Sequence, residues 1–178
     1  ISVGTQALTA RRYGERNEAE CGSVLRAGLG LGLLVAVPLV AAAPLLARIS
    51  GPLLSADPAV VDQGTAYLSY RLLGAGFMLL NWIFQAFFAG IGRTRHQMVA
   101  SFLITTTNIV FDYLLIFGHA GLPRMEIRGA AIASSIAVAI GMCYYIAVVV
   151  SPSYRRRYLQ ASGGGAARRW VRPIVRLS

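Results

Sequence analysis

The stretch that decides the fold is residues 98–118, which read MVASFLITTTNIVFDYLLIFG. This run is apolar and has the length of about 20 residues that a helix needs to cross the hydrocarbon core of a bilayer. It nevertheless carries a carboxylate, Asp112, with an amide, Asn108, one helical turn away. A charge in hydrocarbon is costly, so an acidic residue inside a membrane span predicts a functional site.

Three further apolar runs accompany this one, so that spans are predicted at residues 23–50, 63–91, 97–118 and 128–150. The composition agrees: 56% of the 178 residues are hydrophobic, 13% are charged and the mean hydropathy is +0.58. A soluble domain has about 25% charged residues. Short loops join the spans, and a loop is expected at 51–62. The sequence therefore predicts an all-α, polytopic transmembrane bundle with the lipid bilayer as its solvent.

The basic residues predict the orientation of the bundle. All 17 are arginines, and 13 of them lie before residue 27, between the second and third spans, or after residue 154. Three lie in the opposite loops, and Arg71 lies within the second span. By the positive-inside rule, the first group faces the cytoplasm. The net charge of +10 is therefore explained by the orientation of the bundle in the membrane, and no nucleic-acid partner is expected.

The chain divides into three predicted segments. Residues 1–22 are the end of a transmembrane helix and a cytoplasmic loop, residues 23–150 are the transmembrane bundle, and residues 151–178 are a basic cytoplasmic linker that leads into another helix. We expect the chain to be a fragment of a longer protein, because it begins without Met and ends where an apolar rhythm resumes. Gly28 and Gly32, at GxxxG spacing, predict close helix packing.

Asp112 shares one helix face with Asn108, Thr105 and Ser101, which fall within about 60° of arc at 100° per residue. It lies about 9 Å inside the outer end of its span. Because burial disfavours a charged carboxylate, proton binding is expected, and the oxygen ligands would equally suit Na⁺. The alternative is a structural hydrogen-bonded pair. No other metal and no cofactor is expected.

A second polar stripe runs along residues 63–91, within about 100° of arc. Its members are Tyr67, Tyr70, Arg71, Gly74, Met78, Asn81 and Gln85. We expect the substrate path to be lined by Tyr67, Tyr70, Arg71, Met78, Asn81 and Ser101, and the cation to be bound by Asp112, Asn108, Gln85 and Thr105. Arg71 is either a counter-ion or snorkels to the outer surface. Asn81 and Gln85 either line an interior shared with Asp112 or form interhelical hydrogen bonds.

The last predicted span offers only Ser134 and Ser135 on a small-residue face, which favours tight packing. His96 and His119 are expected at opposite membrane surfaces, both solvated. The sequence contains no GxSxG, HExxH or P-loop pattern and no paired acidic motif, so an enzyme is not expected.

Several segments, in order along nearly the whole chain, resemble the multidrug and toxic compound extrusion (MATE) family. They are residues 4–7, 12–14, 67–71, 88–95, 108–118 and 129–133. The resemblance implies helices 2 to 6 of a six-helix N-terminal lobe, followed by the inter-lobe linker. The Asn108 and Asp112 spacing resembles the DinF-type branch, where these positions belong to a cation site. Gln85 stands near an expected ligand of the fourth helix, although an Asn is often found there.

The resemblance implies an antiporter that is driven by H⁺ or Na⁺ and exports drugs or other organic, often cationic, compounds. The partners would be these substrates and the helix 1 and C-terminal lobe of the parent chain, in a bacterial inner membrane. Three alternatives remain: a lipid-linked oligosaccharide flippase, a membrane-bound prenyl or acyl transferase, and a truncated product that does not transport. Arg71 alone lies deep in a span, which disfavours a polyanionic headgroup.

Overall fold

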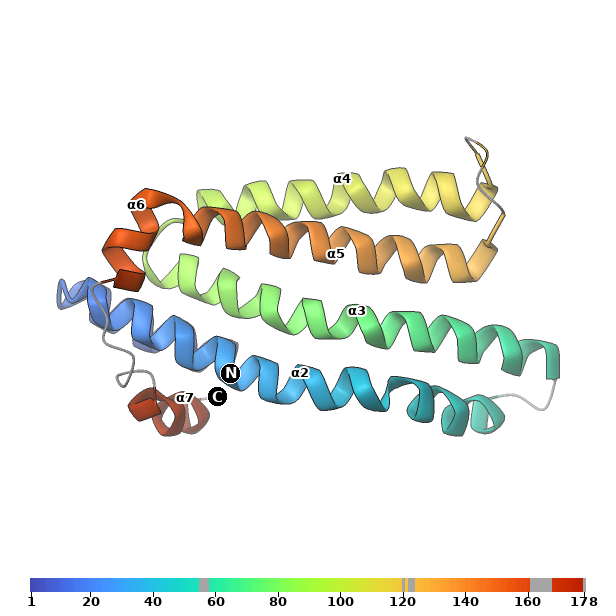
Figure 1. Ribbon diagram of the computed structural model, residues 1–178, viewed down its shortest axis with the longest axis horizontal. Helices are drawn as coiled ribbons and strands as arrows, with labels where there is room; N and C mark the ends of the chain where they lie inside the picture. The colour runs from blue at the N-terminus through green and yellow to red at the C-terminus, as the bar shows by residue number, and fades with distance from the viewer. Residues whose placement is uncertain (55–57, 120, 122–123, 161–167, 178) are drawn as a thin grey trace. The chain divides into compact units, whose positions relative to one another are not determined.

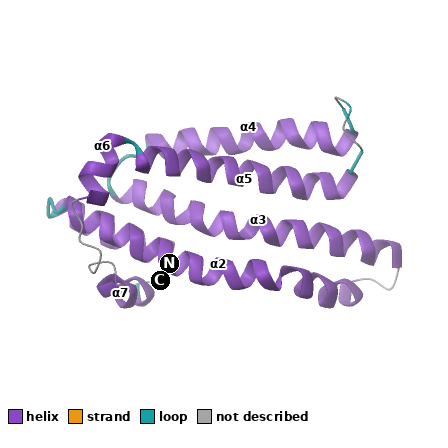
Figure 2. Ribbon diagram, viewed as in Figure 1, coloured by secondary structure: helices purple, strands orange, loops and turns teal. Residues whose placement is uncertain are grey.

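The computed structural model describes residues 1–54, 58–119, 121, 124–160 and 168–177, and every regular element in these ranges is helical (Figures 1 and 2). The elements are α1 (Ser2–Gly14), α2 (Glu18–Leu54), α3 (Pro58–Gly90), α4 (Arg95–Phe117), α5 (Glu126–Val150), α6 (Pro152–Tyr154), the π-helical turn η1 (Arg155–Gln160), the 3-10 turn η2 (Arg168–Trp170) and α7 (Val171–Arg176). The predicted all-α fold is confirmed.

Helices α2, α3, α4 and α5 are the four described helices that are long and apolar enough to cross a membrane. Two of them reach into residues 51–62, where a loop was predicted, because α2 runs to Leu54 and α3 begins at Pro58. A proline in the first turn of a helix loses no hydrogen bond. Pro52 lies within α2 but beyond its apolar span Glu18–Ser50, so the helix continues past the residue at which a loop was predicted.

The chain forms two compact units, and each long helix contributes to both. Unit 1 comprises Ile1–Leu34, Leu79–Ser101 and Met142–Ser178. Unit 2 comprises Val35–Met78 and Phe102–Gly141. The two units are described separately below.

Unit 1 has an aromatic core. Tyr145 of α5 stacks on Phe84 and Phe88 of α3, with ring centroids 5.6 and 5.5 Å apart. Small residues allow its helices to approach closely. A Cβ atom at Gly28 would lie 2.8 Å from Thr5 Oγ1, and one at Gly32 would lie 2.4 Å from Ile83 Cδ1. The close packing predicted from the GxxxG spacing is therefore present.

Unit 2 is held together by small residues on α5. A Cβ atom at Gly74 of α3 would come within 2.5 Å of Ser135 Oγ, and one at Gly129 would lie 2.9 Å from the Leu115 carbonyl of α4. At one end, Arg128 Nη2 lies 2.7 Å from Asp62 Oδ2. The tight packing predicted for the small-residue face of residues 128–150 is thus confirmed.

Candidate functional site

The candidate site lies in unit 2 and is built around Asp112. The uninterrupted helix α4 places Asp112 one turn after Asn108, and both side chains are half-buried. The Oδ1 atom of Asp112 is buried and makes no hydrogen bond to any residue that the structure describes. An unpaired buried oxygen is energetically unfavourable, so a ligand that satisfies it, such as a proton or a cation, would stabilise the site.

Helix α5 supplies the partner of Asn108. The Asn108 side-chain nitrogen donates to Ser134 Oγ across 3.3 Å. This bond uses the amide nitrogen, so it leaves the carbonyl oxygen of Asn108 for other donors or for a cation. Asp112, Asn108 and Ser134 therefore contribute carboxylate, amide and hydroxyl oxygens, the donor types that suit a hard cation. Ser134 was predicted only as a packing residue.

The neighbouring serine connects α5 to α3. Ser135 Oγ lies 2.9 Å from the carbonyl oxygen of Ala131 in its own helix and 3.0 Å from that of Tyr70 in α3, so its single proton is shared between these two acceptors. Consecutive serines of α5 therefore contact α4 and α3, respectively. The contact at Tyr70 uses its backbone, while its side chain is 41% exposed.

Of the other predicted site residues of unit 2, Tyr70 takes part in these hydrogen bonds only through its backbone carbonyl. Thr105, Tyr70 and Arg71 are exposed, whereas Tyr67 and Met78 are half-buried. Their predicted roles as cation ligand or path lining stay predictions. The choice for Arg71 between counter-ion and snorkelling also stays open.

Asn81, Gln85 and Ser101 belong to unit 1. Asn81 is 2% exposed, and Ser101 is exposed. Gln97 of α4 donates through Nε2 to the backbone carbonyl of Gln85 at 2.9 Å, so a polar contact joins α3 and α4 at this point. An interior that Asn81 and Gln85 share with Asp112 stays a prediction.

The structure corrects the expectation for His96. This side chain is half-buried, and its ring nitrogens lie 2.9 Å from the hydroxyls of Tyr144 and Tyr154. Its ring also packs on Phe88, with centroids 4.9 Å apart. His96 is therefore a structural link rather than a solvated side chain. No pattern in the sequence connects residues so far apart. His119, by contrast, is exposed as expected.

A cluster of charges ties the predicted linker to the start of α2. Arg157 donates to Glu18, and Arg169 donates to Glu20. Glu20 also pairs with Arg12 of α1 at 3.2 Å. The sequence predicted this segment as a basic linker but did not predict that acidic residues at the N-terminus of α2 hold it.

Comparison with known proteins agrees with this architecture. The family model described as MatE matches residues 1–114. The chain is 28% identical to a probable multidrug resistance protein NorM of Thermotoga maritima over 95% of this chain and 36% of that protein. It is 32% identical to the multidrug resistance protein PmpM of Pseudomonas aeruginosa over 69% of this chain and 26% of that protein. A third relative, 27% identical over 84% of this chain and 33% of that protein, is an FAD transporter of Shewanella oneidensis.

Solved structures share the fold at lower identity. A MOP superfamily transporter from Pyrococcus furiosus, whose binding pocket has reversed polarity, aligns with a TM-score of 0.83 at 22% identity over 99% of this chain and 38% of that chain. A multidrug resistance MATE transporter in the outward-facing conformation aligns with a TM-score of 0.82 at 22% identity, over 98% of this chain and 38% of that chain. The chain thus spans about a third of the length of the proteins it matches.

Proposed function

The chain belongs to the multidrug and toxic compound extrusion (MATE) family, and from this membership we propose that it forms the N-terminal lobe of a cation-coupled antiporter. It is an integral membrane protein, and family membership agrees with the prediction that it is not an enzyme. The proposed cargo is drugs or other organic, often cationic, compounds. The remaining helices of both lobes would come from the same parent chain.

The observation that carries this proposal is the buried Oδ1 of Asp112, which has no hydrogen-bond partner in the described residues. A proton would neutralise the carboxylate, and Na⁺ would bind its oxygens together with those of Asn108 and Ser134. Either ligand changes the charge next to the hydrogen bond that joins α4 to α5. Coupling requires that the cation and the substrate favour different conformations of the same helices.

Transport would then follow from alternating access, as one lobe rocks against the other. Cation binding at Asp112 would weaken the hold of the lobe on its organic substrate and favour release outside. The arginine distribution supports a cytoplasmic location for residues 151–178, in a bacterial inner membrane. The flippase alternative is not favoured, because named relatives are multidrug resistance proteins. The DinF-type branch stays a prediction.

The test is substrate efflux by the full-length parent in inverted vesicles, with a proton gradient and a Na⁺ gradient imposed separately. Asp112→Asn keeps the size of the side chain but cannot carry the charge. We expect it to bind drug and to lose gradient-driven efflux, while the gradient that drives the unsubstituted protein identifies the ion. Glu126→Gln is the control, because Glu126 is an exposed carboxylate paired with Arg124 at 3.4 Å. Efflux by Asp112→Asn at the unsubstituted rate would show that Asp112 is structural.

A further inference from the structure

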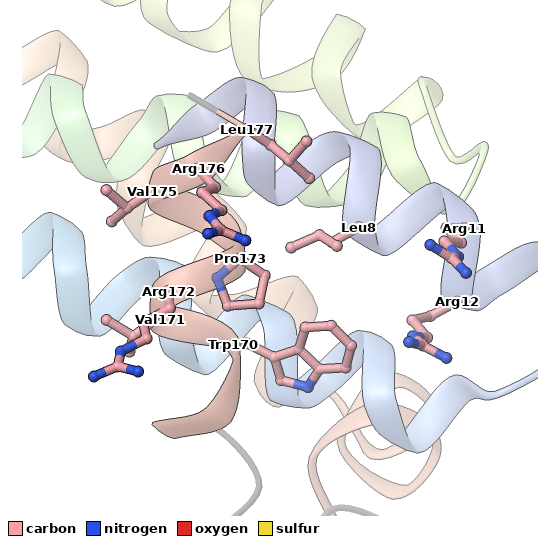
Figure 3. Close-up of a pocket in the computed structure, with 10 residues that line it drawn as sticks. All are labelled: Leu8, Arg11, Arg12, Trp170, Val171, Arg172, Pro173, Val175, Arg176 and Leu177. Carbon is pink, nitrogen blue, oxygen red and sulfur yellow. The ribbon is translucent and has the colours of Figure 1, made fainter.

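A large pocket lies in unit 1 between α1 and α7. Its volume is about 870 Å³. The residues that line it are apolar or arginine: Leu8, Arg11, Arg12, Trp170, Val171, Arg172, Pro173, Val175, Arg176 and Leu177. None of these described residues is acidic. In Figure 3, Leu8, Pro173 and Trp170 lie between the two arginines of α1 and the two arginines of α7.

The pocket lies beside the N-terminal part of α2. The inner side of this region is a small apolar cluster in which Trp170 and Ile174 pack with Leu8, Val24 and Ala27. Val24 and Ala27 lie six and nine residues after the start of α2, so they are roughly 9–14 Å along that helix at 1.5 Å per residue. Trp170 is buried, and the Arg12 guanidinium lies 4.8 Å from the centroid of its ring. Trp beside basic residues is a combination that suits a membrane interface.

The four arginines of the pocket differ in whether they form salt bridges. Arg11 and Arg12 both pair with Glu15, and Arg12 also pairs with Glu20. Arg172 and Arg176 are exposed and take part in none of the salt bridges among the described residues. Their guanidinium groups are therefore the donors that an incoming anion would meet. A guanidinium binds a phosphate through two parallel hydrogen bonds.

The apolar part of the pocket decides which anion fits. Val175 and Leu177 are 59% and 50% exposed, next to Arg176. A small soluble anion would pair with the arginines and leave this apolar surface in water. A ligand with a phosphate and an acyl chain would cover both. Basic pockets beside membrane helices are suited to anionic headgroups.

We propose that this pocket binds an anionic phospholipid, whose phosphate contacts Arg172 and Arg176 and whose acyl chain lies along Leu8, Pro173 and Val175. The lipid would bridge α1 and the segment that follows η2. This inference rests on the pocket of unit 1 and does not depend on cation coupling at Asp112. It can therefore fail while the proposed function holds, and the reverse is also true.

The test uses the full-length protein in neutral detergent, titrated with dioleoylphosphatidylglycerol, with bound lipid counted by native mass spectrometry. We expect the double substitution Arg172→Gln/Arg176→Gln to weaken binding about thirtyfold, because each basic residue near an anionic surface strengthens it about fivefold. Arg172→Lys/Arg176→Lys keeps the charge and should retain most of the binding. Arg155→Gln/Arg156→Gln is the matched control, since both residues are exposed and neither lines the pocket.

A competition experiment separates a lipid from a soluble phosphate. Glycerophosphoglycerol has the same headgroup without acyl chains, and we expect it not to displace the lipid. Displacement at similar concentrations would overturn the assignment to a lipid. Unchanged binding by Arg172→Gln/Arg176→Gln would overturn the proposal, as it would mean that another part of the protein covers the pocket. An equal loss in the control would also overturn it, because the effect would then be general surface charge.

Discussion

Gly74 offers the most direct test of how unit 2 is packed. This residue of α3 faces Ser135 of α5, and a Cβ atom at position 74 would lie 2.5 Å from Ser135 Oγ and 3.2 Å from Ser135 Cα. The hydroxyl is held in place, because its single proton is shared between the carbonyl oxygens of Ala131 and Tyr70 at 2.9 and 3.0 Å. Gly74→Ala must therefore separate the two helices or break these hydrogen bonds.

The size of the effect follows from three contributions. Overpacking typically destabilises by about 1–3 kcal/mol, and a lost interhelical hydrogen bond in a membrane protein by about 0.6 kcal/mol. Alanine regains about 1 kcal/mol of helix propensity over glycine. We therefore expect Gly74→Ala to lower the free energy of unfolding by about 0.5–2.5 kcal/mol. Gly64→Ala, in the same helix, has nothing within 4 Å of its new Cβ atom and should be neutral or stabilising.

The assay is equilibrium unfolding of the full-length protein in mixed micelles, with both variants compared under identical conditions. Ser135→Gly should restore stability in the Gly74→Ala background, because it removes the atoms that the new methyl group meets. Such a coupling between two substitutions identifies direct contact. If Gly74→Ala is as stable as Gly64→Ala, or if Ser135→Gly brings no recovery, then α3 and α5 do not pack as described here.

Two further predictions concern the segment after α5. Glu20→Gln removes the carboxylate that accepts a hydrogen bond from Arg169 and pairs with Arg12. Because the partly exposed ion pair to Arg169 is lost, trypsin should cut after Arg169 about two- to fivefold faster. Glu126→Gln is the control, and equal cleavage rates for the two variants would refute this role of Glu20. Burial raises the pKa of Tyr158 from its ordinary 10 to about 12. The folded state therefore holds this proton more tightly than the unfolded state, so its contribution to stability is present below pH 10 and lost as the pH rises towards 12. Tyr158→Phe should flatten that loss in unfolding measurements, and an unchanged pH profile would contradict the burial of the hydroxyl.

Much of the architecture could be predicted because it depends on patterns within single helices. The four spans follow from runs of apolar residues, and the shared face of Asn108 and Asp112 follows from the helical repeat. Contacts between helices depend on their rotation and offset, which a single sequence does not contain. The hydrogen bond from Asn108 to Ser134 and the position of His96 between Tyr144 and Tyr154 were missed for this reason.

The end of α2 shows a different limit. Gly51-Pro52 predicted a loop, because proline breaks helices in water, yet α2 continues to Leu54. Proline at this position removes one backbone donor, which is the loss of a single hydrogen bond in a helix of 37 residues. The Gly51-Pro52 pair therefore predicts the end of α2 too early.

The two serines of α5 suggest how a change at Asp112 would spread within unit 2. Ser134 accepts the hydrogen bond from Asn108 of α4, and Ser135 donates to the backbone of Tyr70 in α3. A cation that draws the Asn108 side chain towards Asp112 would strain the first of these contacts. Because Gly74 leaves Ser135 no room to shift sideways, α5 would respond by moving along or about its axis, and α3 would move with it. We therefore expect the effect of cation binding at Asp112 to reach α3 through the small-residue face of α5. Tightly packed helices transmit a displacement, whereas an exposed side chain such as Arg71 would absorb it.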